Sequence, residues 1–406
     1  MPAIHQRLAL LVLLLLLMAA PAHAGVATAP GANLEVSLIT YGPGETYWER
    51  FGHDAIELRD SADGEAISFN YGVFDFDESG FLLNFARGRM HYLMDAAPTA
   101  VDESYYVQVG RSITRQRLAF TPEQAAALRD FLLWNLRPEN ARYDYDYYTD
   151  NCSTRVRDAL DRALGGILKQ AMAKTSGGMT YRQQTDRLMS AQPWLMVLLD
   201  LGLGPYADHP LSGWQESFLP MVLQREVRGI QVSDGHGGER PLVSNEVLVS
   251  PNRLDTPPKT APDLRGPMAL AGASLAIVLL LTRRRWPTGQ ALLGSAFLLF
   301  AGLAGVLMLG LWTLTSHHSA WANANLLLFN PLAFALIPAL WRARRLVAPS
   351  RYVDGLMIVQ LVATLIAVAL HLLPGVVQQN QPWLLFALPV WLALAWTLRR
   401  ASTIHT

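Results

Sequence analysis

Cysteine is almost absent from this chain, since Cys152 is the only one in 406 residues. An internal disulfide is therefore excluded, and so is a zinc site built from cysteine pairs. The sequence also has no His-Glu-x-x-His string and no Gly-rich phosphate loop ahead of a helix. Basic and acidic residues balance at 33 each, so the charge gives no indication of a nucleic-acid partner. We expect no metal, no other cofactor and no bound nucleic acid.

Acidic residues are nearly missing from residues 266–406, where Asp354 is the only one. The same stretch contains long apolar runs, which predict an all-α membrane domain of about five transmembrane helices. The expected spans lie near residues 267–282, 291–314, 326–341, 355–373 and 383–398. Arginines cluster at 283–285, 342–351 and 399–400, which this topology places on one side. Because arginine marks the cytoplasmic side, we expect the preceding domain to lie outside.

The N-terminus predicts export independently. An apolar run at residues 8–20 is followed by small residues at Ala22 and Ala24, the pattern of a signal peptide cleaved after Ala24. We therefore expect a signal peptide over 1–24, an exported domain over 25–232, a linker over 233–265 and the membrane domain over 266–406. The linker is expected because that stretch is rich in glycine, proline and charge.

The stretch around Cys152 predicts the start of a helix. Asp150, Asn151, Ser153 and Thr154 are residue types that cap helices or fill their first turn. A cysteine on the first turn lies beside free amides and the positive end of the helix dipole, which favour a thiolate. In an exported, oxidising setting the lone thiol is either reactive or a small buried apolar residue. Both interpretations stay open on this stretch alone.

A cysteine nucleophile needs a base and a group that orients the base. His53 is the best candidate base, because it begins a predicted strand; His91 is the second choice. Asp63-Gly64 predicts a hairpin turn, so Asn70 falls on the strand next to His53 and becomes the candidate orienting group. Residues 33–41 are expected to form a strand, and residues 105–120 one or two more. Thr121 is expected to cap a helix.

The outer membrane loop at residues 316–325 has two interpretations. Its residues include His317, His318, Asn323 and Asn325, and no Lys, Arg, Asp or Glu. It is either a plain polar loop ahead of a helix-breaking proline, or part of a site at the outer membrane surface.

Several strings resemble a known family. They are Trp48-x-x-Phe51-Gly52-His53, Asn70-Tyr71-Gly72, Tyr143-x-Tyr145-Asp146-Tyr147, Asp150-Asn151-Cys152-x-Thr154-Arg155-x-Arg157-Asp158 and, in the membrane part, His318 with Asn323-Ala324-Asn325. Together they resemble the Lnb proteins, which are bacterial lipoprotein N-acyltransferases. The Asp-Asn-Cys string is the most specific of these.

The resemblance implies an α+β fold, a circularly permuted papain/NlpC-like exported domain followed by membrane helices. It implies that Cys152 is the nucleophile and His53 the base, with Asn70 as the third residue by position. It also implies a location in the bacterial inner membrane, with the N-terminal domain in the periplasm. The candidate substrate-binding residues are Trp48, Tyr71, Tyr147, Asn151, Arg155, His318 and Asn325.

The leading hypothesis is an acyltransferase that uses a Cys152 thioester, with phospholipid and lipoprotein substrates. One alternative is a papain-like cysteine hydrolase acting on peptidoglycan peptides or lipid esters. Another is a non-enzymatic envelope binding protein with an inert Cys152. The membrane spans favour a lipid substrate, because a wall peptidase needs only a tether.

Overall fold

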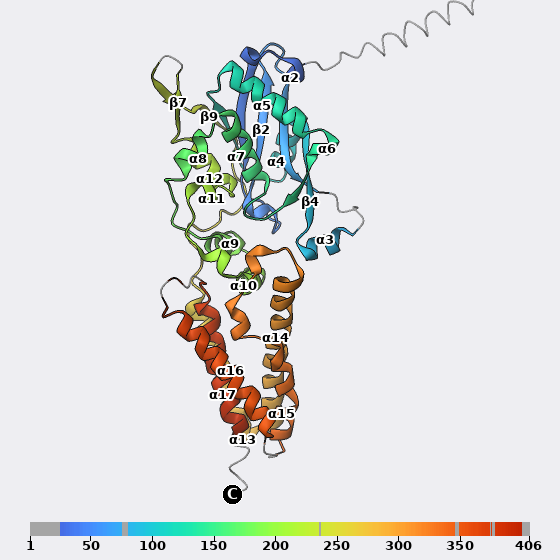
Figure 1. Cartoon of the computed structure of the whole chain (residues 1–406), viewed down its shortest axis with the longest axis vertical. Helices are drawn as coiled ribbons and strands as arrows, with labels where there is room; N and C mark the ends of the chain where they lie inside the picture. Colours follow the sequence, from blue (N-terminus) through green and yellow to red (C-terminus); the bar gives the residue numbers. More distant parts are fainter. Residues whose placement is uncertain are drawn as a thin grey trace, which may run out of the picture. The chain divides into compact units, whose positions relative to one another are not determined.

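The computed structural model describes residues 25–74, 80–234, 237–345, 349–373, 375 and 378–399. The expected signal peptide, residues 1–24, lies outside the described residues. The described chain divides into two compact units (Figure 1). The first unit holds residues 25–74, 91–175 and 212–254, and the second holds 80–90, 176–211 and 255–399.

The first unit is built on a seven-stranded sheet in the order β6-β4-β3-β2-β1-β5-β9. Its strands are β1 Leu34–Tyr41, β2 His53–Asp60, β3 Ala66–Val73, β4 Met90–Pro98, β5 Ile113–Leu118, β6 Arg142–Tyr145 and β9 Val243–Ser250. The predicted first strand and the hairpin of β2 with β3 are confirmed. Strand β9 lies within the stretch expected to be a linker. A separate hairpin joins β7 Gln231–Ser233 to β8 Glu239–Pro241.

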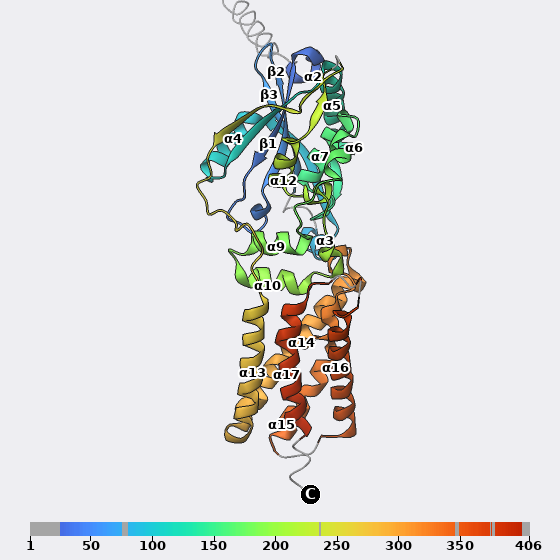
Figure 2. The same ribbon diagram turned by 90° about the vertical axis from the view of Figure 1, so that its left-hand side faces the viewer.

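Helices cover both faces of this sheet (Figure 2). Helix α4 Thr99–Gln108 lies on one face, and α5 Pro122–Asn135 and α7 Cys152–Ala163 lie on the other. The core between the sheet and α5 and α7 includes Leu38, Ile56, Leu58, Leu132 and Leu160, none of which is exposed to solvent. The shorter helices of the unit are α2 Gly25–Thr28, η1 Gly31–Asn33, η2 Glu49–Phe51, α6 Pro138–Ala141, α8 Ile167–Met172, α11 Gly213–Glu216 and α12 Pro220–Val227.

Two local predictions have different outcomes. The Thr121 cap of α5 is confirmed, with the reciprocal Thr121 and Gln124 hydrogen bonds of a capping box. The expected strand at residues 105–108 is wrong, because α4 runs through Gln108. The ring of Tyr106 stacks on that of Tyr41 at 3.7 Å between centroids. Packing of this helix on the sheet therefore overrides the local β preference of its residues.

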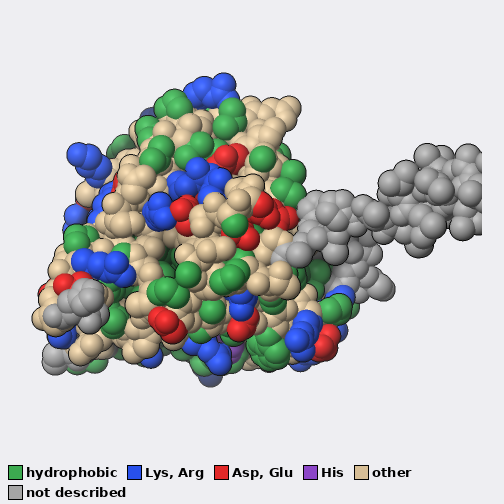
Figure 3. Space-filling view, turned by 90° about the horizontal axis from the view of Figure 1, so that it is seen from above, with side chains coloured by type: hydrophobic (Ala, Val, Ile, Leu, Met, Phe, Trp, Pro, Cys, Tyr) green, Lys and Arg blue, Asp and Glu red, His purple; other side chains and the backbone are tan. Residues whose placement is uncertain are grey.

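Figure 3 shows a face of the molecule on which basic and acidic side chains lie interspersed, with apolar side chains between them. Among the exposed ion pairs of the first unit is that of Arg117 with Glu35, 2.6 Å apart. Exposed pairs of this kind contribute at most about 1 kcal/mol each. The buried core, and not this charged surface, therefore holds the unit together.

The second unit contains five apolar segments long enough to cross a membrane. Four are continuous helices, α13 Arg265–Arg285, α14 Pro287–Leu314, α16 Arg351–Leu370 and α17 Gln381–Arg399. Each overlaps one predicted span. The third span is broken into η4 His318–Ala320, η5 Ala324–Leu327, η6 Pro331–Leu336 and α15 Ile337–Ala343. The expected α+β class, with a C-terminal domain of membrane helices, is confirmed.

The break in the third span exposes backbone groups that side chains of neighbouring helices satisfy. The Gln360 amide donates to the Leu327 carbonyl at 3.1 Å, and the Trp391 indole N–H donates to the Leu328 carbonyl at 2.9 Å. Asn330, at the start of η6, donates to Gln360 at 2.6 Å. Unpaired backbone groups are costly where water is absent, so these contacts allow an irregular span.

The second unit also includes four segments that precede the membrane helices in sequence: α3 Phe81–Arg87, α9 Tyr181–Met189, α10 Pro193–Gly202 and η3 Pro205–Asp208. The buried Arg182 of α9 pairs with Asp200 at 2.9 Å and Asp208 at 2.7 Å. The indole N–H of Trp383, in the first turn of α17, donates to Asp200 at 2.6 Å. Polar contacts therefore join α9 and α10 to the membrane helices.

Candidate active site

Cys152 is the first residue of α7, as the sequence predicts. Asn151 caps the helix. Its side-chain oxygen accepts from the backbone N–H of Thr154 at 3.0 Å, and the Thr154 hydroxyl accepts from the backbone N–H of Asn151 at 2.7 Å. The Asn151 amide group donates to the Tyr147 and Phe218 carbonyls at 2.9 and 3.0 Å. These contacts give the buried Asn151 side chain a helix-capping role, and its contact with substrate stays a prediction.

His53 is the first residue of β2, and Asn70 lies on the neighbouring strand β3. The register pairs Ala55 with Asn70, so Asn70 is a diagonal neighbour of His53 on the sheet. The His53 Nε2 atom is 2.9 Å from the Asn70 side-chain oxygen. The hairpin register therefore brings together the two residues that the sequence proposed as base and orienting group.

Asp102 of α4 fixes the direction of the Asn70 amide. The Asn70 NH2 group donates to the Asp102 carboxyl at 2.8 Å, which leaves the Asn70 oxygen facing His53. An amide oxygen only accepts, so His53 carries its proton on Nε2. Its Nδ1 atom is then the basic nitrogen. Sequence reasoning missed Asp102, because it lies in a helix just ahead of residues that were expected to form strands.

A second missed residue, Asp54, links the two halves of the site. Ser153 donates to Asp54 at 2.7 Å, and Thr40 donates to the other carboxyl oxygen at 2.7 Å. Ser153 follows Cys152 and Asp54 follows His53, so this contact ties the start of α7 to the start of β2. The His53 ring bonds to Asn70. Within the described parts of the chain, no hydrogen bond joins the His53 ring to the Cys152 sulfur. The sequence did contain a signal for Asp54. Side chains alternate between the two faces of a strand, and along β2 this alternation puts the Asp54 carboxyl on the core-facing side.

Burial sets the protonation of the site. It lowers the pKa of His53 to about 4 and raises the pKa of Cys152 to about 12, to which the Asp54 carboxyl also contributes. The Asp54 and Ser153 backbone amides oppose the shift at Cys152. At neutral pH the resting pair is therefore a neutral thiol and a neutral imidazole. The expectation that the helix N-terminus favours a thiolate is wrong for this resting state, because desolvation outweighs the helix-end amides.

Aromatic side chains gather near the site. Tyr47 and the predicted substrate residue Trp48 are about half exposed, and their rings meet edge to face at 4.6 Å. The ring of Tyr145 is 6.2 Å from that of Tyr147, another predicted substrate residue, and 4.3 Å from that of Tyr92. Whether Trp48 and Tyr147 bind substrate stays a prediction.

Two further predicted substrate residues, Tyr71 and Arg155, line a hollow of about 300 Å3. The hydroxyl of Tyr71, which is buried, donates to Asn135 at 2.8 Å. Arg155 forms a two-pronged ion pair with Asp150. Both side chains therefore already have protein partners, and their role toward a substrate stays a prediction.

The predicted membrane-loop residues lie in the second unit. His318 is exposed, and its ring lies 4.4 Å from that of Trp321. Asn325 is fully buried; it donates to the Leu201 carbonyl at 3.0 Å and accepts from Asn380 at 2.9 Å. Asn325 therefore has a packing role, and its contact with substrate stays a prediction.

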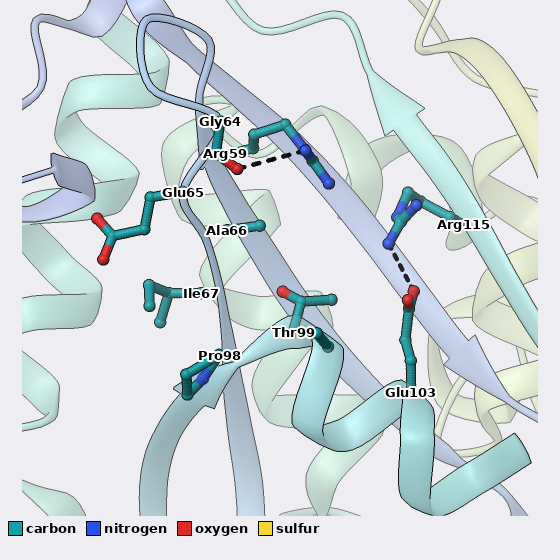
Figure 4. A pocket seen from close by; sticks show the side chains of 10 residues that line it. Arg59, Gly64, Glu65, Ala66, Ile67, Pro98, Thr99, Glu103 and Arg115 are labelled. Carbon is teal, nitrogen blue, oxygen red and sulfur yellow. Dashed lines mark hydrogen bonds and ion pairs between the residues drawn. The ribbon is translucent and has the colours of Figure 1, made fainter.

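The remaining candidates lie away from these contacts. His91, the second-choice base, is 3.0 Å from Asp144. The pocket of Figure 4 has a volume of about 430 Å3 and contains none of the predicted site residues. Arg115 and Glu103 form an ion pair of 2.5 Å across it. Over the residues that the structure describes, no cluster of three or more His, Cys, Asp or Glu could hold a metal ion.

The fold and the site define a class: a membrane protein whose α+β domain carries a histidine on an early strand and a cysteine at the start of a later helix. The model of the Lnb N-terminal periplasmic domain matches residues 22–187, and that of the Lnb transmembrane domain matches residues 259–402. The two matches cover more than half of the chain, which belongs to the Lnb family. Comparison with curated proteins and with solved structures found no match.

Membership has direct consequences. The chain is a multi-pass membrane protein whose N-terminal domain lies in the periplasm. At the level of the family, it is a membrane-bound enzyme that modifies lipoproteins.

Proposed function

We propose that this protein is a cysteine acyltransferase of the bacterial inner membrane, which N-acylates the N-terminal cysteine of lipoproteins through a thioester on Cys152. The hydrogen bond between Ser153 and Asp54 is the observation that carries this proposal. It ties the first turn of the Cys152 helix to the strand that begins with His53, while Asn70 accepts from Nε2 of His53 and leaves its Nδ1 atom bare. Family membership and the membrane unit support a lipid-linked substrate.

The first half-reaction forms the thioester. The His53 Nδ1 atom takes the thiol proton as the Cys152 sulfur attacks an ester carbonyl carbon, and the carbonyl electrons move to its oxygen. Collapse of this tetrahedral intermediate breaks the carbon–oxygen ester bond. The leaving alcohol takes the proton from His53, and the acyl chain stays on sulfur.

The second half-reaction transfers the chain. The α-amine of a lipoprotein's N-terminal cysteine attacks the thioester carbonyl, and His53 accepts a proton from the amine. The carbon–sulfur bond breaks, and His53 returns the proton to the Cys152 sulfur. A neutral resting pair suits this route, because His53 acts as a general base at the moment of attack and no thiolate need persist in water.

The aromatic side chains are the proposed lining for the acyl chain. Tyr47, Trp48 and Tyr147 offer apolar rings with polar tips, which suits the boundary between an acyl chain and its headgroup. Their replacement by alanine should raise KM more than it lowers kcat, because they would contact the chain and not the reacting carbonyl.

The test uses the full chain in lipid nanodiscs, an isotopically labelled phospholipid and a synthetic diacylglyceryl-cysteine lipopeptide. A gain of one labelled acyl chain on the lipopeptide amine identifies the phospholipid as donor. An unchanged mass, with an amide in place of one ester, identifies the lipopeptide as its own donor. Both results support the proposal if the Cys152→Ala and His53→Ala variants abolish them.

Three results contradict it. Release of free fatty acid without amide formation supports a hydrolase. No change in lipid or lipopeptide supports a binding protein. Transfer by the Cys152→Ala variant at the unmodified rate removes the thioester from the mechanism.

A further inference from the structure

The hydroxyl of Tyr143 is buried, and among the residues that the structure describes it has no hydrogen-bond partner. Few buried polar groups in folded proteins are left unpaired, because each costs about 1–3 kcal/mol. An unpaired donor beside an active site is therefore a candidate for a ligand contact. Burial raises the pKa of Tyr143 above its usual range, with a further contribution from Cys152, so this hydroxyl stays protonated.

The hydroxyl lies close to the nucleophile, on the far side of Gly72. A Cβ atom built on Gly72 would be 3.5 Å from the Cys152 Cβ atom and 3.9 Å from the Tyr143 hydroxyl oxygen. Gly72 has φ of +94°, a conformation that side chains disfavour, and it marks the irregularity in the pairing of β3 with β4. The missing side chain leaves space between the sulfur-bearing residue and the hydroxyl.

The surroundings hold the Tyr143 ring in place. The Arg155 guanidinium lies 4.2 Å from the ring centroid, and the ring of Tyr71 meets it edge to face at 6.2 Å. Arg155 is itself fixed by its ion pair with Asp150. Asp150 and Arg155, which flank Cys152 in sequence, thus position Tyr143.

We infer that the Tyr143 hydroxyl donates a hydrogen bond to the oxyanion that forms when Cys152 attacks the ester carbonyl. The inference rests on the proposed acyl transfer. As the carbon–sulfur bond forms, the carbonyl π electrons move to oxygen, and Tyr143 O–H donates to that oxygen without transferring its proton. Collapse restores the carbonyl and releases the alcohol. Arg155 is then a positioning residue, which acts through the Tyr143 ring.

The test is Tyr143→Phe, which removes only the hydroxyl. Loss of one oxyanion donor should lower kcat by on the order of 100-fold with little change in KM. The thermal midpoint should stay equal or rise, because the variant removes an unpaired buried group. A purely structural role would lower the midpoint and leave the kcat of the folded fraction unchanged.

Tyr41→Phe is the matched control. Tyr41 is buried too, and the groups that shift its pKa include the neighbouring Ser68 hydroxyl but not Cys152. Its ring stacks on that of His53 at 5.9 Å, a contact that phenylalanine keeps. The Tyr41→Phe variant should keep kcat within about threefold. Equal loss of kcat in both variants, or a Tyr143→Phe variant within about threefold of the unmodified chain, overturns the inference.

A second readout separates this inference from the proposed function. A long-chain fatty aldehyde forms a reversible hemithioacetal on a cysteine, with an oxygen where the oxyanion would be. Tyr143→Phe should weaken its binding by the same order of magnitude as it lowers kcat, and Cys152→Ala should abolish it. If the unmodified chain binds the aldehyde but transfers no acyl group, the proposed function fails while the aldehyde affinity still decides the role of Tyr143. Equal aldehyde affinity with and without the hydroxyl overturns that role.

A separate observation concerns the second unit. Helix α10 is short and apolar, and it exposes Trp194, Leu198 and Leu199. Helix α3 exposes Leu82, Leu83 and Phe85. Large exposed apolar groups on neighbouring positions mark a surface that meets a partner or a membrane.

Contacts within the unit indicate which of these it meets. The Leu201 carbonyl of α10 accepts from Asn323 at 2.8 Å, in the outer loop that leads into the third span. The Arg87 carbonyl at the end of α3 accepts from the Ser316 amide at 2.8 Å, two residues after α14 ends. Both helices are therefore bonded to the outer ends of membrane segments. We propose that α3 and α10 lie in the headgroup region of the outer leaflet with their apolar sides toward the acyl chains.

Depth-dependent quenching tests this placement. In a Cys152→Ser background of the full chain, a bimane fluorophore is attached to Leu198→Cys or Leu82→Cys in nanodiscs. Lipids with a spin label near the headgroup should quench both more strongly than lipids labelled near the chain centre. Leu303→Cys, on an exposed position of α14, should show the reverse order, and Val247→Cys on β9 should be quenched by neither. Quenching of the α3 and α10 labels by aqueous iodide alone overturns the proposal.

Discussion

Asp54 offers a test in which removal of a charge should stabilise the protein. Its carboxyl is fully buried between the hydroxyls of Thr40 and Ser153. Ser153 has one proton but two acceptors in reach, Asp54 at 2.7 Å and the Ser217 carbonyl at 2.8 Å. An ionised Asp54 accepts from Ser153, as described above, and leaves the Ser217 carbonyl without that proton. When Asp54 is protonated its carboxyl can instead donate to Ser153, which then donates to Ser217. Asparagine can make the same contacts, so Asp54→Asn should preserve the network.

The magnitude follows from the pKa. Burial raises the pKa of Asp54 from 3.8 to about 7. The folded state therefore binds this proton more tightly than the unfolded state, and stability is lost as the pH rises from about 4 to about 7. At 1.36 kcal/mol per pKa unit, ionisation above pH 7 costs the folded state about 4 kcal/mol. Asp54→Asn avoids this cost and should be more stable than the unmodified chain at about pH 8, with a difference below about 1 kcal/mol at pH 4.

Thermal unfolding of the full chain, followed by tryptophan fluorescence at both pH values, measures the effect. For a domain of this size, 4 kcal/mol corresponds to a shift of about 10 °C. Asp54→Ala is the control: it leaves the Thr40 and Ser153 hydroxyls without this partner and should lower the midpoint at both pH values by about 1–3 kcal/mol per group. An Asp54→Asn variant that loses equal stability at pH 4 and pH 8 would show that the carboxylate, and not the acid, is the buried form.

Three other changes test separate parts of the account. Asn70→Ala removes a hydrogen bond that raises the pKa of His53, so the acid limb of kcat/KM should move below about pH 4. The rate should also fall by about 10- to 100-fold. An acid limb at higher pH contradicts the assignment of His53 as the base and Asn70 as its partner. Arg182→Leu leaves Asp200 and Asp208 buried without their cation and should lower the free energy of unfolding by about 3–5 kcal/mol. An unchanged thermal midpoint would show that this buried ion-pair network does not stabilise the protein. Asn151→Ala should lower the free energy of unfolding by about 1 kcal/mol and should also lower kcat. The matched cap variant Thr121→Ala should lose similar stability with kcat unchanged. Equal kcat in both variants would show that the Asn151 cap does not position Cys152.

Local patterns predicted much of the fold, because the features involved are local. The cap at Asn151, the cap at Thr121 and the turn at Asp63-Gly64 each depend on a few consecutive residues. The apolar spans and their arginines depend on composition alone. Helix α4 was missed because its β-forming residues are held in a helix by packing on the sheet. Tyr106 of α4 stacks on Tyr41 of β1, a residue distant in sequence.

The site was predictable only in part for the same reason. Cys152 and His53 stand in strings that point to chemistry, and Asn70 followed from the hairpin. Asp102 is connected to Asn70 only through the packing of α4 on the sheet. The contact of Asn325 with Asn380 could not be predicted, because Asn380 comes from another part of the chain. The resting protonation of Cys152 needed its burial, which residue types near a helix end do not give.

The acyl-enzyme itself is the most direct test of the central claim. The full chain is mixed with labelled phospholipid or lipopeptide donor without an acceptor amine, stopped in acid and digested for mass spectrometry. We predict one acyl chain on the peptide that contains Cys152. Neutral hydroxylamine should release it, as it releases a thioester, and the His53→Ala variant should lack it. Acyl transfer that proceeds while Cys152 stays unmodified would contradict this prediction.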